Sequence, residues 1–298
     1  MDSQDNQGET GFDAKSNEIK QKTPVHITGL KNIVQIACGN NHVVALDKDG
    51  TAWTWGTGPE CQLGRRTIER RPKAGLVPSP VGVPKKQITK IFCGPEHSFA
   101  IDKKGNVWAW GLNSMGQCGI PFPEWEEKST VAPAAKVDML KGRNIASLVG
   151  GGLHSVAITQ NGEVITFGAT GWNQAGIKID DLPEEDFRMD SRGKRAMTLV
   201  PHVVPGMSSN TVRLVWTLLT SLDIVCDVVA AAGEVTIAVD RDGKAYSWGQ
   251  SSQGNLGQGA QDAVIGATPI NNTAVRDRKL VWAGCGGQFS VLAALQEA

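Results

Sequence analysis

Short apolar runs separated by polar turns organise most of this chain. In the first clear example the runs are Ile33 to Cys38, His42 to Leu46 and Thr51 to Trp55, separated by Asn40-Asn41 and Asp49-Gly50. Such runs, bounded by Asn, Asp and Gly, are typical of antiparallel β-strands joined by tight turns. We expect Asp49-Gly50 to supply the positive φ angles of a two-residue hairpin turn. The pattern predicts strands, because no unit keeps a helical periodicity over three turns.

Glycine recurs in a fixed frame along these runs. The frame positions of the first three units, spaced 11, 6 and 8 residues apart, are Gly39, Gly50, Gly56 and Gly64; Gly94, Gly105, Gly111 and Gly119; and Gly151, Gly162, Gly168 and Gly176. A fourth unit keeps Gly243, Gly249 and Gly257 but begins with Ala232, and a fifth begins at Gly286. Self-similarity at a period of about 55 residues indicates a repeat protein. The units start near residues 31, 86, 143, 225 and 278.

Each complete unit also ends its third run on a large aromatic residue, namely Trp55, Trp110, Phe167 and Trp248, which we interpret as packing residues. A polar loop follows and closes on a sequence such as GQCG at 116–119 or GNLG at 254–257. A fourth short strand after each closure would complete a four-stranded sheet, the unit of a β-propeller. We therefore predict an all-β fold, a β-propeller, with a parallel β-helix as the alternative.

One segment departs from the repeat. Residues 212–230 include the apolar sequence LVWTLLTSLDIVCDVV, interrupted by Asp223 and Asp227. First frame positions lie 81 residues apart here, from Gly151 to Ala232, against 57 in the preceding interval. The segment is short for a membrane-spanning helix and carries two charges, so we expect no membrane association. We interpret it either as a surface insertion or as sequence foreign to the repeat.

Composition narrows the function classes. Thirty basic and thirty acidic residues give a formal net charge of zero, so bulk charge does not call for nucleic acid or an anionic membrane. The six cysteines have no metal-ligand spacing, and we expect buried thiols in a reducing compartment rather than disulfides. The first residues lack a secretory signal. The sequence also lacks the nucleophile-elbow, zinc-protease and phosphate-loop motifs, so we expect neither enzymatic chemistry nor a cofactor.

The repeat resembles that of the regulator of chromosome condensation family. The stretch KIFCGPEHSFAIDKKGNVWAWGLNSMGQCG at 90–119 matches the family pattern nearly end to end. The segments QLGRRTIERR at 62–71, LPEEDFRMDSRGKRA at 182–196 and AGCGGQFSV at 283–291 are similar to those of the fungal exchange factors for the Ran GTPase. The family fold is a seven-bladed propeller. This chain therefore resembles the C-terminal part of such a protein, an incomplete ring over 31–298 preceded by a wedge-like segment at 1–30.

The resemblance implies a guanine-nucleotide exchange factor for a Ran-type small GTPase in the nucleus, with chromatin as a further partner of the full-length parent. It implies GTPase contacts from the wedge residues Asp5, Asn6, Gln7, Gly8 and Glu9, and from Asn41, Arg65, Glu96 and His154. Because blades are absent, we expect impaired exchange from this chain alone. The alternative function is a propeller scaffold without exchange activity.

Structural alternatives stay open for the individual residues. His42, His97 and His154 share the third position after a frame glycine, so they are equally compatible with a structural role that satisfies backbone groups within their own blades. Asn41 also suits a turn, and Arg65 begins a basic cluster that includes Arg66 and is compatible with a solvated face. The wedge is compatible with an unstructured leader.

Overall fold

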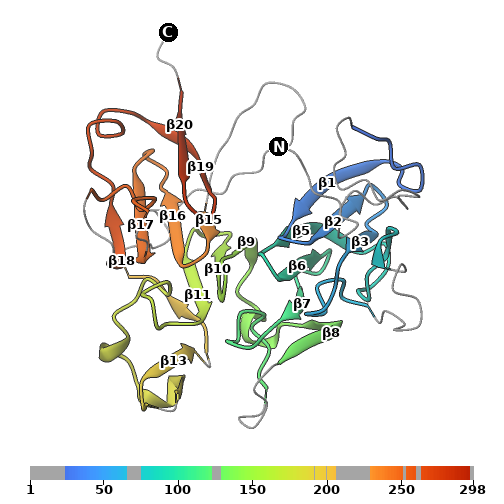
Figure 1. Cartoon of the computed structure of the whole chain (residues 1–298), viewed down its shortest axis with the longest axis horizontal. Helices are drawn as coiled ribbons and strands as arrows, with labels where there is room; N and C mark the ends of the chain where they lie inside the picture. The colour runs from blue at the N-terminus through green and yellow to red at the C-terminus, as the bar shows by residue number, and fades with distance from the viewer. Residues whose placement is uncertain are drawn as a thin grey trace. The chain divides into compact units, whose positions relative to one another are not determined.

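The computed structural model describes residues 24–65, 75–122, 129–190, 192–198, 200–205, 229–250, 253–259 and 263–295. These residues form antiparallel β-sheets and turns with a few one-turn 3-10 helices, which confirms the all-β prediction. The chain divides into two compact units (Figure 1). Unit 1 takes in residues 1–114 and 122–141, and unit 2 takes in 115–121 and 142–298.

Unit 1 contains two four-stranded sheets, each with its strands paired in chain order (Figure 1). The first consists of β1 (Ile33–Cys38), β2 (His42–Asp47), β3 (Ala52–Gly56) and β4 (Ser79–Pro80). The second consists of β5 (Ile88–Cys93), β6 (His97–Asp102), β7 (Val107–Leu112) and β8 (Thr130–Lys136). The predicted fourth strand after the closure is present in both sheets.

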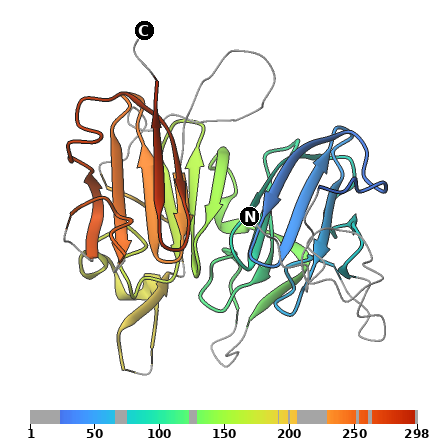
Figure 2. The same cartoon turned by 45° about the horizontal axis from the view of Figure 1, so that its top comes forward.

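Unit 2 repeats the same sheet and adds two hairpins. Its first sheet consists of β9 (Ile145–Gly150), β10 (His154–Thr159), β11 (Val164–Gly168) and β14 (His202–Val203), and its second of β15 (Val229–Ala232), β16 (Val235–Val239), β17 (Ala245–Gln250) and β18 (Ala263–Pro269). The hairpins are β12 (Phe187–Met189) with β13 (Arg195–Thr198), and β19 (Leu280–Cys285) with β20 (Ser290–Ala294). The β19–β20 hairpin, red in Figure 2, packs against β15 and β16. The strands that begin a few residues after the five expected unit starts are β1, β5, β9, β15 and β19.

The turn between the second and third strands differs from the one expected. Gly50 has a positive φ of 84°, but Asp49 is not among the residues with positive φ. A two-residue turn with two positive φ angles is therefore wrong, and the glycine alone takes the left-handed conformation. In the second sheet, Asp102 fixes this turn by accepting hydrogen bonds from the backbone N–H groups of Lys104 and Asn106, both at 2.9 Å. Burial would raise the pKa of Asp102, but its hydrogen bonds outweigh burial and lower that pKa.

The core of each unit lies between successive sheets. Val44, Ile91 and Trp110 belong to one buried cluster in unit 1. The predicted packing aromatics are buried, and they also connect sheets: Trp110 Nε1 donates to the Gln62 carbonyl at 2.8 Å, and Trp248 Nε1 donates to the Gln174 carbonyl at 3.1 Å. Each indole therefore docks on the closure loop of a neighbouring sheet and satisfies its N–H group there.

Two other expectations have mixed outcomes. The insertion at 212–230 lies outside the described residues except for its last two, which begin β15. In the described part of the chain, no helix has the length and apolar character needed to cross a bilayer. Cys38 is exposed, so the expectation of buried thiols fails there. The reason is that alternate side chains of β1 face outward.

Candidate functional site

The turns before the second strand of each sheet carry several of the predicted contact residues. Each turn is closed by a backbone hydrogen bond from the frame glycine to the histidine: Gly39 N to His42 O at 2.9 Å, and Gly94 N to His97 O at 2.7 Å. This closure leaves two residues at the tip of each turn. The glycine frame therefore places Asn41 and Glu96, both partly exposed, at turn tips of neighbouring sheets in unit 1.

A hydrogen-bond network holds the Glu96 side chain in place. Its Oε1 accepts from Asn40 Nδ2 at 3.1 Å, and its Oε2 accepts from Gln62 Nε2. Gln62 is itself buried, and its Oε1 accepts from the Glu60 backbone N–H at 2.9 Å. The two turns and the closure loop thus meet at one carboxylate. Sequence reasoning missed Asn40 and Gln62, although a buried amide side chain recurs at the closure position in every complete unit.

Asn41 follows Asn40 in the chain and therefore lies next to this network. The Asn41 carbonyl accepts hydrogen bonds from the backbone N–H of Thr57 at 2.8 Å and from the Thr57 hydroxyl at 3.3 Å. The backbone of Asn41, in the β1–β2 turn, is therefore bonded to the first residue of the β3–β4 loop, and the Asn41 side chain is partly exposed. The structure brings Asn41 and Glu96 to one polar surface, joined by the Asn40–Glu96 hydrogen bond.

Arg65 occupies a different position. Its Nη2 donates to the Thr54 carbonyl at 3.4 Å, which places the guanidinium beside the middle of β3. Partial burial lowers the pKa of Arg65. A contact between Arg65 and a GTPase stays a prediction.

The frame histidines lie inside the units. His42 Nε2 lies 2.7 Å from Ser98 Oγ, and His154 Nε2 lies 2.9 Å from Thr236 Oγ1, in each case on a neighbouring sheet. Both side chains are fully buried, and burial lowers the pKa of each to about 4. The packing alternative is favoured for both, with a hydroxyl of the next sheet as partner rather than backbone of the same blade. The buried His154 side chain gives no structural support to a direct contact with a GTPase. That contact stays a prediction.

The imidazole rings of His42 and His154 lie so close to the frame glycines Gly39 and Gly151 that no larger residue fits there. A Cβ on Gly151 would overlap the His154 ring, and a Cβ on Gly39 would overlap the ring of His42.

The wedge residues lie outside the described part of the chain, so the predicted contacts from Asp5, Asn6, Gln7, Gly8 and Glu9 are untested.

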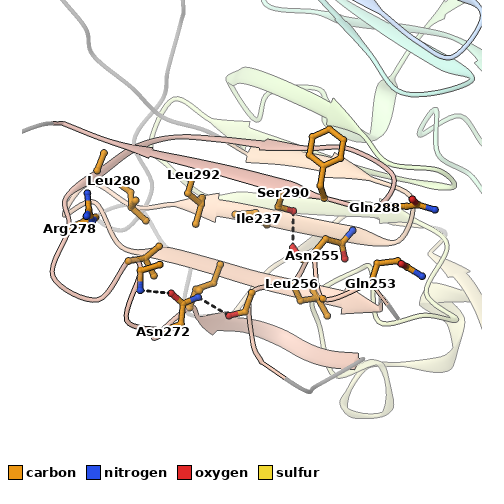
Figure 3. A pocket seen from close by; sticks show the side chains of 17 residues that line it. Ile237, Gln253, Asn255, Leu256, Asn272, Arg278, Leu280, Gln288, Ser290 and Leu292 are labelled. Atoms are coloured by element: carbon orange, nitrogen blue, oxygen red, sulfur yellow. Dashed lines mark hydrogen bonds between the residues drawn. The ribbon is translucent and has the colours of Figure 1, made fainter. Parts of the chain in front are cut away.

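A hollow lies in unit 2, between the β17–β18 loop and the β19–β20 hairpin (Figure 3). It has a volume of about 550 Å³ and is lined by Leu256, Leu280 and Leu292 on one part and by Arg278 and Gln288 near its ends. Leu256 and Leu280 also belong to the apolar core of this unit. Among the described residues, no three His, Cys, Asp or Glu side chains form a group that could hold a metal ion.

Comparison with known proteins agrees with the sequence resemblance. The chain is 36% identical over 270 residues to Protein pim1 of Schizosaccharomyces pombe, covering 90% of this chain and 47% of that protein. It is 33% identical to Guanine nucleotide exchange factor SRM1 of Saccharomyces cerevisiae, covering 96% of this chain and 56% of the relative. The chain thus spans about half the length of the curated relatives it matches.

Solved structures give the same result. The crystal structure of Prp20p from Saccharomyces cerevisiae, a protein studied for its binding to Gsp1p and histones, matches with a TM-score of 0.81 at 31% identity and covers 95% of this chain and 60% of that one. Yeast RCC1 (Prp20) bound to Kap60 matches with a TM-score of 0.80. The sequence profile of the RCC1-like domain matches residues 3–292, and this chain belongs to that family.

Proposed function

We propose that this chain acts in guanine-nucleotide exchange on a Ran-type small GTPase. The observation that carries the proposal is the 33% identity, over 96% of the chain, to a protein named as a guanine nucleotide exchange factor. The likeness to Prp20p, whose binding to Gsp1p has been described, supports the same partner class. The polar surface around Glu96 supplies a place where such a partner can dock.

The proposed mechanism is competition between two binding equilibria. A small GTPase holds its nucleotide through backbone N–H groups of a phosphate loop and a magnesium ion. A protein that binds the nucleotide-free GTPase more tightly must, by linkage, weaken nucleotide binding by the same factor. Each tenfold preference corresponds to about 1.4 kcal/mol. The mechanism needs no covalent step by this chain.

Glu96 is the residue best prepared for this contact. Asn40 and Gln62 hold its carboxylate in one orientation, so little side-chain entropy is lost when a partner binds. A carboxylate held in this way accepts hydrogen bonds from basic or amide donors of the GTPase. Asn41, at the adjacent turn tip, adds a neutral donor and acceptor. Arg65, His154 and the wedge residues remain predicted contacts with less structural support.

The test is release of labelled GDP from purified Ran in the presence of excess GTP. The unmodified chain is expected to accelerate release, but less than a full-length relative such as SRM1. Glu96→Gln is expected to reduce that acceleration about tenfold, corresponding to about 1.4 kcal/mol. The matched control is Glu163→Gln, in the β10–β11 hairpin turn, which should behave like the unmodified chain. Binding to Ran without any acceleration would overturn the exchange proposal and favour a scaffold.

We also place this activity in the nucleus and include chromatin as a further partner. Support comes from the Regulator of chromosome condensation of Xenopus laevis, 26% identical over 92% of this chain, and from the described binding of Prp20p to histones. A fluorescent fusion that stays outside the nucleus and fails to co-sediment with nucleosomes would contradict this part of the proposal.

A further inference from the structure

A second, polar hollow of about 410 Å³ lies in unit 2 and shares no lining residue with the Glu96 surface. Residues from several loops line it, including Trp172 after β11, Glu234 in the β15–β16 turn, and Gln253 and Asn255 in the β17–β18 loop. None of the described residues that line it is basic. Its chemistry is therefore that of hydrogen-bond acceptors, amides and one exposed indole.

Asn255 breaks a rule that the other units follow. At the same closure position, the Oε1 atoms of Gln62, Gln117 and Gln174 each accept from a backbone N–H two residues earlier, at 2.9, 2.8 and 2.7 Å. Asn255 is one methylene shorter, and its Oδ1 is buried without a hydrogen-bond partner among the described residues. Only 6% of the Asn255 surface is exposed. The fourth unit thus retains a buried amide side chain, but the amide oxygen does not accept a hydrogen bond from the backbone of the described residues.

The free acceptor is held in a fixed position. Ser290 Oγ donates to the Asn255 backbone carbonyl at 2.7 Å, which ties the closure loop to β20 (Figure 3). Figure 3 shows the Asn255 and Gln253 side chains near one another at one end of the neighbouring apolar hollow, and both residues line the polar hollow too. A buried acceptor without a partner costs about 1 to 3 kcal/mol, so a ligand that donates a hydrogen bond there recovers this energy.

Two other side chains that line the hollow, Glu234 and Trp172, favour a cationic ligand. Glu234 contributes a partly exposed carboxylate, and the described residues include no ion pair that neutralises it. Trp172 is 53% exposed, and its backbone is fixed by the hydrogen bond from its N–H to Gln174. An indole face attracts a flat cation, and a carboxylate binds two N–H groups of a guanidinium together. An anion would find no basic side chain among the described residues that line this hollow.

We propose that this hollow binds an arginine side chain of a partner protein. The guanidinium donates to Glu234 and to Asn255 Oδ1 while its plane lies against the Trp172 indole. Arginine fits better than lysine because its planar group offers several donors in fixed directions. The site uses none of the residues assigned to GTPase contact, and its test contains no GTPase, so the two proposals can fail separately.

The direct test uses the indole N–H resonance of Trp172 in the ¹⁵N-labelled chain, assigned with Trp172→Phe. N-acetyl-arginine methylamide is expected to shift this resonance in a saturable way and to bind more tightly than the lysine analogue. The citrulline analogue has the same shape without the charge and should give no saturable shift. Equal shifts with arginine and citrulline, or no saturable shift with arginine, would overturn the proposal.

Two variants test the assigned residues. Asn255→Gln restores the side-chain length of the other units, so its oxygen should bond to the backbone and arginine affinity should fall about tenfold. Glu234→Gln removes the charge and should lower affinity by a similar factor, whereas Glu163→Gln in the same unit should not. The other indole resonances report whether each variant is folded. Unchanged affinity in both folded variants would assign the shift to another site and reject this one.

Discussion

His42 and His154 are neutral in the folded chain, because burial lowers the pKa of each to about 4. Each ring instead uses Nε2 in a hydrogen bond to a hydroxyl on the neighbouring sheet, Ser98 Oγ for His42 and Thr236 Oγ1 for His154. Protonation would place a charge in the buried interior of each unit. At the scale of the residue, these histidines therefore make folding sensitive to mild acid.

The free energy of unfolding is expected to fall as the pH drops from about 6.5 towards 4. In that window the unfolded chain binds protons on these histidines and the folded chain does not, so stability is complete above the unfolded pKa and is lost on acidification. The slope is about 1.4 kcal/mol per pH unit for each histidine. Urea unfolding at several pH values measures it, and His154→Gln should remove about one histidine's share.

The control for this experiment is His26, which is exposed. His26→Gln is measured in parallel, because it replaces a histidine without changing a buried side chain. If His154→Gln and the unmodified chain show the same slope between pH 6.5 and 5, the buried histidine is not the source of the acid sensitivity.

At the scale of the element, two frame glycines in the second sheet are under different structural constraints. Gly111 lies in β7, one residue before its end, with a φ of 105°, and a Cβ there would overlap the Glu96 carbonyl. Gly105, in the β6–β7 turn, has a φ of 77°, but a Cβ there would meet nothing within 4 Å. One position combines backbone strain with a steric clash, whereas the other has strain alone.

Gly111→Ala is therefore expected to destabilise the chain more than Gly105→Ala. The positive φ costs about 1 to 2 kcal/mol for alanine at either position, and the clash adds to this at Gly111 only. Urea unfolding compares the two variants. Because the clash displaces the turn that carries Glu96, Gly111→Ala should also slow GDP release, while Gly105→Ala should not. Equal losses of stability would show that the Glu96 carbonyl moves aside without cost.

The strands and the packing aromatics could be predicted from the sequence, because alternating apolar runs and glycines at fixed spacing are local signals. The partners of the histidines could not. Ser98 lies 56 residues from His42 and Thr236 lies 82 residues from His154, so these contacts depend on how whole sheets stack. The same holds for the hairpin of β12 and β13, which the repeat pattern does not contain.

The candidate site was predicted in the same uneven way. The glycine frame was sufficient to place Asn41 and Glu96 at turn tips. It was not sufficient to show that Gln62 reaches across to the Glu96 carboxylate, or that Arg65 folds back against Thr54, because a loop path depends on tertiary packing. Asn255 stands out from sequence only after the glutamines at the same position are known to bond to backbone.

At the scale of the whole molecule, formal charge and apolar exposure both favour self-association. The chain has a net charge of zero and a pI near 7.0, so charge repulsion between copies is weakest near neutral pH. Ile36, three residues before the frame glycine of the first sheet, is 62% exposed, and Val34 is 48% exposed. At the position equivalent to Ile36, Ile91 is fully buried against the neighbouring sheet. The outer face of β1 thus exposes an apolar side chain, Ile36, at a position that, in the second sheet, packs against a neighbouring sheet.

Ile36→Lys is expected to lower self-association at pH 7 without loss of fold, because the lysine replaces an exposed apolar side chain with a charge on a sheet surface. Sedimentation velocity over a range of concentrations measures the effect, and raising the pH to 8.5 should act in the same direction in the unmodified chain. Val25→Lys is the matched control, since Val25 is 48% exposed but lies outside the strands. It adds the same charge, so an equal reduction by both variants would assign the effect to net charge alone and reject β1 as the contact surface.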